Sequence, residues 1–371
     1  MIGAPPVRCP FALVPPMLPI RRLAALCALA LLSPLLLAMP MTSARAADPP
    51  WSHPWMTDIR ADHPLVGRIL DARTGAALDP EAVTERLAGA DLVILGEKHD
   101  NPDHHRAQAW LLERMVSAGR HPAVVWEMLD AGQGAALADY LVRPDADAPG
   151  LGPAVDWGES GWPDWALYQP IAAVALDADL PLLPGNLPRA DIRRAAMEGW
   201  EAVVGAEGLA PRALDVPFPD ALREALGAEI LRGHCDMLPE SALPGMIAAQ
   251  RLRDGEMARA LLVGANLEET DGAVLIAGNG HARADRAVPW VLGHLAPEAS
   301  VLSVGVLEVP EDLPADPAPA DLRDTDADTG PPPFDLVVLT PALEDVDPCE
   351  KFREQLERMR ERHEGGGGKN D

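Results

Sequence analysis

Short apolar runs alternate along this chain with longer stretches in which apolar residues recur at helical spacing. Runs with the length and composition of buried strands lie at residues 92–95, 123–129, 180–186, 272–277, 301–309 and 334–340. Stretches with helical spacing lie at residues 79–90, 101–119, 132–141, 162–178 and 189–265. Strands that alternate with helices are typical of a parallel sheet covered by helices. The pattern therefore predicts an α/β fold with a mostly parallel sheet flanked by helices, and a helical subdomain at about 189–265.

Proline and polar residues predict the boundaries of several elements. Asn101 followed by Pro102 is typical of a helix N-terminus, because the asparagine can cap free backbone N–H groups and proline needs no hydrogen bond at the first helical position. We also expect a short strand and turn at 63–75, a polar loop at 143–153, and a break at Pro170 in the helix that contains it.

The first 46 residues have the composition of a secretory signal peptide. Arg21 and Arg22 precede a long apolar run, and Ala44 and Ala46 form a cleavage site of small residues. Cys27 is preceded by Leu26 and the apolar run continues after it, which argues against lipid attachment there. We therefore expect cleavage close to Ala46, an exported periplasmic protein and no lipid anchor.

The 371-residue chain is 48% hydrophobic and 24% charged, which is enough apolar material for a sizeable core. Its net charge of −26 argues against nucleic acid and anionic membrane surfaces as partners. We expect an α/β domain at 47–309, an Asp/Pro-rich linker at 310–333, and a C-terminal strand, charged helix and Gly-rich tail at 334–371.

Two cysteines remain after the expected cleavage, Cys235 and Cys349. Disulfides persist in the oxidising compartments to which exported proteins are sent. We expect the two cysteines to pair, which would tie the C-terminal extension back beside His234.

Polar or ionisable residues follow four successive predicted strands. They are Glu97 and His99 after the first, Glu127 at the end of the second, Arg189 after the third and His281 after the fourth. Ligands of open parallel sheets bind beyond the carboxyl ends of the strands. We therefore expect a binding or catalytic site at this edge.

Two of these histidines lie in Gly-x-x-His segments, 96–99 and 278–281. Glycine permits a positive φ and close backbone approach, so the following histidine can turn back over the sheet edge. We expect His99 and His281 to belong to one site.

Three further histidines are candidate ligands. His104 and His105 lie in the first turn of a predicted helix, where the positive end of the helix dipole favours the neutral imidazole that binds metal or haem iron. Alternatively, one of them packs on the sheet and the other is solvated. His234 lies in a break between helices and is either a ligand or a structural loop residue.

Several known catalytic motifs are missing from the sequence. It contains no G-x-S-x-G, phosphate-binding loop, His-Glu-x-x-His or paired Cys-x-x-Cys motif, and Gly-Asn-Gly before His281 is too short for a dinucleotide-binding loop. Serine-nucleophile, nucleotide-dependent and zincin chemistry therefore have no support.

Five segments resemble the ChaN family of haem-binding uptake proteins, whose superfamily includes the Tiki metalloproteases and erythromycin esterases. They read LVILGEKHDNPDHHRAQ, VVWEML, YQPIAAVALDADLPLLPGNLPR, AAQRLRDGEMARAL and VLIAGNGHARADRAVPWVL. The resemblance covers about residues 63–308. It implies an α/β fold with a helical subdomain and a role in iron or haem acquisition on the bacterial envelope. Many ChaN-like proteins are lipoproteins, whereas this chain lacks a convincing lipid-attachment sequence.

The resemblance predicts a periplasmic haem- or iron-binding protein, with haem in an apolar cleft between the sheet edge and the helical subdomain. An imidazole or a tyrosine phenolate would bind the iron, and only two tyrosines, Tyr140 and Tyr168, exist. Arg189 or Arg283 would pair with the haem propionates. The candidate haem-binding residues are His99, His104, His105, Tyr168, Arg189, His234 and His281. Expected partners are an iron-containing ligand, envelope uptake machinery and a second copy of the chain.

Two alternatives remain open. In the Tiki-like branch, two Gly-x-x-His segments and an intervening glutamate serve metal-dependent hydrolysis, and both segments and Glu127 match here. Glu97, His99, Glu127 and His281 would then hold a divalent ion that activates water. The other alternative is an envelope scaffold that has kept the fold without the site.

Overall fold

Eight strands in the described part of the chain form one sheet, in the order β2-β1-β8-β7-β3-β6-β4-β5. Their bounds are β1 Ile69–Asp71, β2 Ala77–Leu78, β3 Leu92–Leu95, β4 Ala123–Asp130, β5 Leu182–Asn186, β6 Ala273–Ile276, β7 Val301–Glu308 and β8 Leu336–Thr340. The six strands from β8 to β5 are parallel, whereas β1 pairs antiparallel with β2 and β8. The predicted α/β fold with a mostly parallel sheet is confirmed.

Helices cover both faces of the sheet, so its central strands are buried on either side. In β3, Val93 and Leu95 belong to the core on one face, while Leu92 and Ile94 belong to the core on the other. All four side chains are buried. This two-sided burial explains why the strand is a continuous apolar run in the sequence.

Six helices line one face and share its core. They are α1 Pro80–Ala88, α2 Pro102–Ser117, α3 Gly134–Leu141, α4 Ala148–Ala154, α5 Trp157–Ser160 and α6 Trp165–Asp177. As predicted, α2 begins at Pro102, and the Asn101 side chain accepts a hydrogen bond from the Asp103 backbone N–H. The Gly-Glu-Lys-His segment therefore lies in the short connection between the end of β3 and the capped start of α2.

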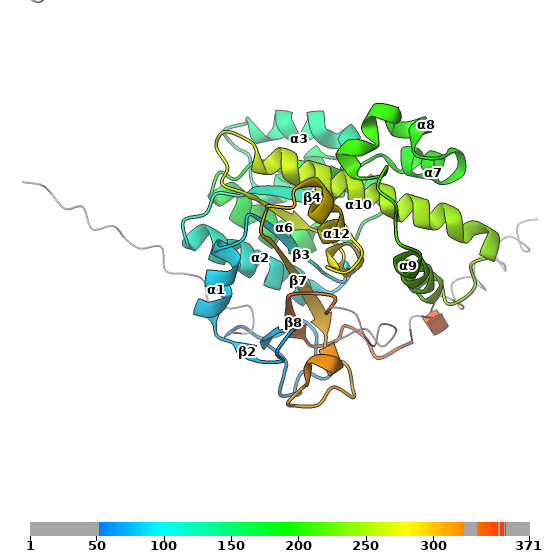
Figure 1. The fold of residues 1–371 in the computed structure, drawn as a ribbon. Helices are drawn as coiled ribbons and strands as arrows, with labels where there is room; N and C mark the ends of the chain where they lie inside the picture. Colours follow the sequence, from blue (N-terminus) through cyan, green and yellow to red (C-terminus); the bar gives the residue numbers. More distant parts are fainter. Residues whose placement is uncertain (1–51, 323–331, 348, 352, 354–371) are drawn as a thin grey trace, which may run out of the picture. The chain divides into compact units, whose positions relative to one another are not determined.

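The opposite side carries the second group of helices. They are α7 Arg189–Glu198, α8 Glu201–Val204, α9 Asp220–Gly233, α10 Leu243–Ala265, α11 Asn279–Ala282 and α12 Val288–Leu295. Met257 and Leu261 of α10 pack in the core on this face, and α10 contacts β4, β5 and β6 (Figure 1). Residues 189–265 are therefore mainly helical and end in a helix that lies directly on the sheet.

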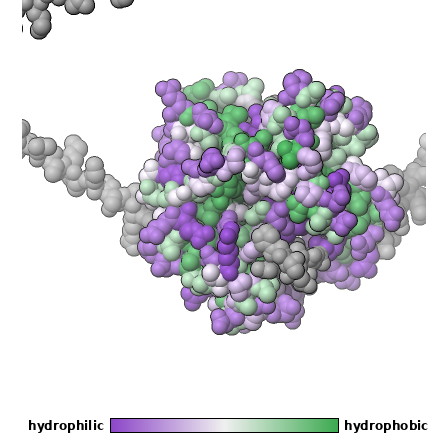
Figure 2. Space-filling view, in the orientation of Figure 1, coloured by the Kyte–Doolittle hydropathy of each residue, from purple (hydrophilic) through white to green (hydrophobic). Residues whose placement is uncertain are grey.

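Short 3-10 helices connect some of these elements: η2 Ala131–Gln133, η3 Ala206–Gly208, η4 Ala210–Arg212, η5 Glu240–Ala242 and η6 Pro319–Leu322. The face of the molecule seen in Figure 2 is covered mostly by hydrophilic residues, with hydrophobic residues in smaller areas between them.

The predicted break at Pro170 is wrong, because α6 runs continuously from Trp165 to Asp177. Proline removes one backbone hydrogen bond inside a helix. Here the buried side chains of Tyr168 and Ile171, on either side of the proline, anchor the helix in the core and keep it continuous.

The polar loop predicted at 143–153 is also partly wrong, since α4 occupies Ala148–Ala154. Asp147 caps this helix by accepting a hydrogen bond from the Gly150 backbone N–H. Glycines and prolines suggested a loop, but the cap and the buried Leu151 stabilise a short helix.

The strand that follows the predicted linker is an integral part of the sheet. β8 lies between β1 and β7, parallel to β7 and antiparallel to β1. Its five residues are all buried. The C-terminal segment therefore completes the fold of the α/β domain.

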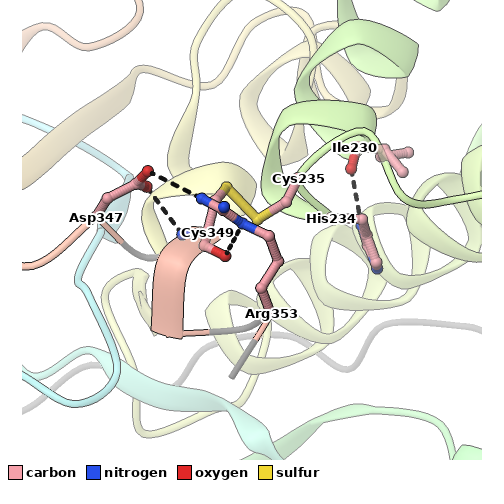
Figure 3. Close-up of a disulfide and its surroundings, with 6 residues drawn as sticks. All are labelled: Ile230, His234, Cys235, Asp347, Cys349 and Arg353. Atoms are coloured by element: carbon pink, nitrogen blue, oxygen red, sulfur yellow. Dashed lines mark hydrogen bonds and ion pairs between the residues drawn. A yellow bond between two sulfur atoms is a disulfide. The ribbon is translucent and has the colours of Figure 1, made fainter. Parts of the chain in front are cut away.

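The predicted disulfide between Cys235 and Cys349 is confirmed, with the Cα atoms 5.3 Å apart (Figure 3). Cys235 follows His234, the residue that ends α9, and Cys349 lies beyond β8. The bond therefore ties the segment after β8 to the helical layer.

The computed structural model describes residues 52–322, 332–347, 349–351 and 353. The predicted signal peptide, part of the Asp/Pro-rich linker, and most of the predicted terminal helix and tail lie outside the described residues. Within the described ranges, no helix combines the length and apolar character needed to cross a membrane.

Candidate functional site

The carboxyl ends of β3, β4 and β6 bring four of the predicted residues together. Leu95 of β3 and Trp126 of β4 both pair with Ile276 of β6. Residues that follow these positions therefore emerge at the same level of the sheet edge. They include Glu97, His99, Glu127 and His281.

The first part of the site is a buried carboxylate that orients a histidine. His99 Nδ1 donates a hydrogen bond to Glu97 Oε1 at 2.7 Å, and Glu97 is 2% exposed. The His99 side chain is 33% exposed, and its Nε2 atom lies 3.9 Å from Glu127 Oε1. Burial lowers the pKa of His99, but the Glu97 hydrogen bond and the Glu127 charge outweigh this effect and raise it.

A second carboxylate–histidine pair approaches from the other side. His281 Nδ1 donates to Asp254 Oδ1 at 2.6 Å, and its Nε2 lies 3.4 Å from Glu127 Oε1. Burial opposes the charge on His281, but Glu127 and Asp254 outweigh burial and raise its pKa to about 9. His281 is therefore an imidazolium at neutral pH.

Glu127 is the charged centre that joins the two pairs. Its Oε2 accepts a hydrogen bond of 2.7 Å from the Gly278 backbone N–H, and its Oε1 bonds to Arg253 Nη2. Burial would raise the pKa of this carboxyl, but His281 and Arg253 hold it well below its usual range. Glu127 therefore remains a carboxylate although it is 1% exposed.

The glycines of the two Gly-x-x-His segments were expected to allow a positive φ and close backbone approach. Neither has a positive φ, so the first expectation is wrong. Close approach, however, does require glycine at both positions. A Cβ atom at Gly278 would lie 2.9 Å from His99 Nε2. A Cβ atom at Gly96 would collide with the side chain of Asn279. The glycines thus let the β3 and β6 ends pack against each other.

A cavity of about 620 Å³ lies beside this cluster and includes Glu127 and Arg253 in its wall. Apolar side chains of Met128, Val155, Trp162, Leu187 and Ile192 and the arginines Arg189 and Arg193 of α7 also line it. The ring of Trp162 lies 4.8 Å from that of His99, edge to face. His99 therefore contacts a residue of the cavity wall without itself lining the cavity, whereas the predicted propionate partner Arg189 lines it.

His104 and His105 are both buried and have structural partners. The Lys98 backbone N–H donates to His104 Nδ1 at 2.8 Å, and His104 Nε2 donates to Thr340 Oγ1 at 2.9 Å. Burial holds the pKa of His104 well below its usual value. His104 is therefore neutral, as expected but because of burial, and both of its ring nitrogens are already used.

His105 lies beside the buried Glu97 carboxylate and packs against Tyr168. Its Nε2 donates to the His99 backbone carbonyl at 3.0 Å, and its ring lies 4.2 Å from that of Tyr168. His105 Nδ1 is 3.1 Å from Glu97 Oε2, although the two atoms lack hydrogen-bond geometry. We therefore assign His105 a packing role in this structure.

Neither tyrosine presents its phenol to the cavity. Tyr168 is fully buried, with its hydroxyl 3.4 Å from Glu97 Oε1. Burial and the nearby Glu97 and Glu127 charges raise the pKa of Tyr168. The Tyr140 hydroxyl bonds to Asp147. The predicted phenolate ligand therefore has no support in this arrangement.

Two other predicted residues lie elsewhere. His234 ends α9 beside the disulfide, and its Nδ1 bonds to the Ile230 carbonyl at 2.7 Å (Figure 3). Arg283 forms an ion pair with Asp285 and is 7% exposed. Neither residue lines the cavity beside Glu127.

The sequence interpretation missed Arg253 and Asp254. Both come from α10, inside the AAQRLRDGEMARAL segment, to which no role was assigned. A signal was present: Gln250, Arg253 and Asp254 are three and four residues apart and therefore share one face of a helix that also packs on the sheet. Polar residues on such a buried face indicate a site.

The alternative ligand, a divalent metal ion, does not fit the side chains as they lie. Among the residues that the structure describes, no group of three or more His, Cys, Asp or Glu side chains could hold a metal ion as they lie. Arg253 instead bonds to the Glu127 oxygen that both histidine Nε2 atoms approach. The guanidinium already supplies a positive charge to this carboxylate.

Comparison with known proteins identifies relatives that match much of the α/β domain. The family model described as "Haem-binding uptake, Tiki superfamily, ChaN" matches residues 83–292. ChaN of Campylobacter jejuni, solved with cofacially bound haem, is 19% identical and has a TM-score of 0.54; the match covers 73% of this chain and 95% of that one. This structural similarity shows a common fold.

Other solved structures are more distant. The type III effector HopBA1 is 13% identical, with 70% of this chain and 92% of that one covered and a TM-score of 0.37. A mutant of the erythromycin esterase EreC is 15% identical, with 75% and 83% covered and a TM-score of 0.35. No curated protein matches the chain in sequence. The family match spans more than half of the chain, and the chain therefore belongs to the ChaN family of haem-binding uptake proteins in the Tiki superfamily.

Proposed function

We propose that this protein binds haem in the cavity at the carboxyl edge of the sheet, as part of haem or iron uptake in the periplasm. The observation that carries the proposal is the position of His99. Its ring packs against Trp162, which lines the cavity, and Glu97 holds its Nδ1 atom so that Nε2 is left to bind iron. A carboxylate behind the ligating histidine is the usual support of an imidazole ligand.

The cavity offers the other groups that haem needs. Its apolar side chains suit the porphyrin, and its size is in the range of small-molecule sites, about 300–1,000 Å³. Arg189 and Arg193 line it and form no ion pair with any residue in the described ranges. Their guanidinium groups are therefore available to the two propionates.

Among the predicted imidazoles next to Glu127, His99 alone combines exposure with an oriented ring. His281 is 4% exposed and is held between two carboxylates, and His104 uses both nitrogens within the protein. We therefore assign the iron-binding role to His99 and the orienting role to Glu97. Export and delivery to envelope machinery, with or without a second copy of the chain, complete the proposal.

A haemin titration tests the assignment. The exported form of the protein, without a polyhistidine tag, is titrated with haemin while the visible spectrum is recorded. We expect saturable binding with the spectrum of a histidine-ligated iron, and a shift of that spectrum with at least about tenfold weaker binding for His99→Ala. The matched control is His234→Ala, which removes a histidine outside the cavity and should leave the titration unchanged.

Two results would contradict the proposal. Absence of binding by the wild-type protein at micromolar haemin would reject a haem site altogether. Wild-type affinity and spectrum in His99→Ala would show that the iron ligand lies elsewhere.

A further inference from the structure

Two oriented histidines converge on one carboxylate oxygen in this site. His99 and His281 each donate from Nδ1 to a buried carboxylate, Glu97 and Asp254 respectively. Both Nε2 atoms then face Glu127 Oε1, at 3.9 Å and 3.4 Å. Histidines held by carboxylates in this way, together with a glutamate, are the donor set of many divalent-metal sites.

Arg253 distinguishes this site from a metal centre. Its Nη2 atom bonds to the same Oε1 atom of Glu127. Its side chain is 23% exposed and lines the cavity, so it reaches Glu127 from the cavity side. Arg253 also directly precedes Asp254, so one turn of α10 delivers both the cation for Glu127 and the carboxylate that orients His281.

We infer that Arg253 takes the place of a divalent cation and excludes such ions from this site, and that its removal turns Glu127, His99 and His281 into a divalent-metal site. A metal ion would have to displace a guanidinium from a buried carboxylate and would be repelled by it if both remained. The inference shares His99 with the haem proposal, but its test measures Zn²⁺ binding in the absence of haemin, so the two can fail separately.

Loss of the guanidinium changes the balance in a defined way. Glu127 would remain buried with the Gly278 N–H and the two histidines as its neighbours. A buried carboxylate that loses its cation is destabilised, and binding of a divalent ion relieves this. Methionine fits the space because it replaces the aliphatic part of the side chain without a charge.

The test uses Zn²⁺ and Co²⁺ with the full exported chain, without a polyhistidine tag. Wild-type protein and Arg253→Met are titrated with Zn²⁺ by calorimetry, and the visible spectrum of added Co²⁺ reports nitrogen ligands. We expect Arg253→Met to bind one equivalent of Zn²⁺ at least about tenfold more tightly than the wild type. Zn²⁺ should also raise the melting temperature of Arg253→Met more than that of the wild type.

Three further variants define the origin of the effect. Arg259→Met is the matched control, because Arg259 lies on the same helix and pairs with another buried carboxylate, Glu256. It should bind Zn²⁺ as weakly as the wild type. Two double variants, Arg253→Met/His281→Ala and Arg253→Met/Glu127→Gln, should lose the new site. The second of these also leaves no buried charge at position 127.

The outcomes are decisive in either direction. Stoichiometric Zn²⁺ binding by the wild type that depends on His281 would overturn the inference, because Arg253 would then exclude nothing. Zn²⁺ binding by Arg253→Met no tighter than by the wild type would overturn it as well. If Arg253→Met is too unstable to purify, Arg253→Gln is used in its place, because it retains a polar contact without the charge. The same two results would then overturn the inference.

Discussion

Histidines at the carboxyl edge of the sheet differ in charge because their partners differ. His281 lies between two carboxylates and is protonated at neutral pH, whereas the buried His104 bonds to a backbone N–H and a hydroxyl and is not. His99 is partly exposed, with one hydrogen-bonded carboxylate, Glu97, and a second, Glu127, at 3.9 Å. The residue type alone therefore does not determine whether an imidazole is a ligand, a cation or part of the core.

His104 leads to a prediction about acid stability. Its pKa is lowered in the folded protein, so the unfolded chain binds a proton first as the pH falls below the unfolded value of about 6.5. The stabilisation of the folded protein by neutral His104 is therefore fully present above this pH and is lost progressively below it. We expect His104→Asn to be less stable than the wild type by about 1–3 kcal/mol at pH 7.5.

Urea unfolding at several pH values checks this prediction. The difference in unfolding free energy between wild type and His104→Asn should shrink between pH 6.5 and 5. A difference that is constant over this range would show that His104 does not titrate with folding.

His281 leads to the opposite dependence at alkaline pH. The pKa of His281 is raised to about 9 in the fold. Protonated His281 therefore stabilises the folded protein fully below the pKa of the unfolded chain, about 6.5. The contribution is lost as the pH rises from there through about 9. We expect the melting temperature of wild type to fall over this range more than that of His281→Gln, and equal slopes in the two proteins would contradict the assignment of the charge.

At the scale of elements, the site depends on how closely the β3 and β6 ends approach. The chain after β6 passes so near His99 that a Cβ atom at Gly278 would meet the imidazole. By contrast, a Cβ atom at Gly280 would meet only Glu229 Oε1, at 3.5 Å. The two glycines lie in the same short segment, and only a Cβ atom at Gly278 would meet His99.

This contrast gives a matched pair of substitutions. We expect Gly278→Ala to displace His99 and weaken haemin binding at least about tenfold, because a 2.9 Å contact with the ring forces it to move. Gly280→Ala should bind haemin as the wild type does. Equal affinities for both variants would show that the contact at Gly278 does not position His99.

At the scale of the whole molecule, the C-terminal segment closes the fold twice. β8 adds to the sheet between β1 and β7, and the Cys235–Cys349 bond joins the chain beyond it to α9. The two cysteines are 114 residues apart in the sequence. A crosslink over such a long loop restricts the unfolded chain strongly.

We therefore expect the disulfide to stabilise the protein substantially. In the chain-entropy model, a loop of this length contributes about 4–5 kcal/mol. Urea unfolding of the Cys235→Ser/Cys349→Ser double variant should show a loss approaching this value, and addition of a reductant should not lower its stability further. A loss below about 1 kcal/mol would mean that the crosslink adds little to the constraint already provided by β8.

Features that depend on neighbours in the sequence were predictable from it. The apolar runs of the strands, the Asn101 cap of α2 and the polar residues at the strand ends follow from local periodicity and backbone chemistry. The disulfide was predictable because only two cysteines remain after position 46. The parallel sheet then follows, since alternating strands and helices have few other ways to bury their apolar faces.

Tertiary structure alone decided which of these residues are used and how. The burial of Tyr168 and His104 depends on α2, α6 and β8, which are distant in the sequence. The contacts of Arg253 and Asp254 depend on α10 lying across β4 and β6, and no local pattern specifies that position. The sequence by itself determined most of the elements, though not the continuity of α6 or the presence of α4, and the sheet edge at which the candidate residues gather. The charges, exposure and partners of its residues were set by contacts between distant segments, because desolvation and ion pairing depend on three-dimensional proximity.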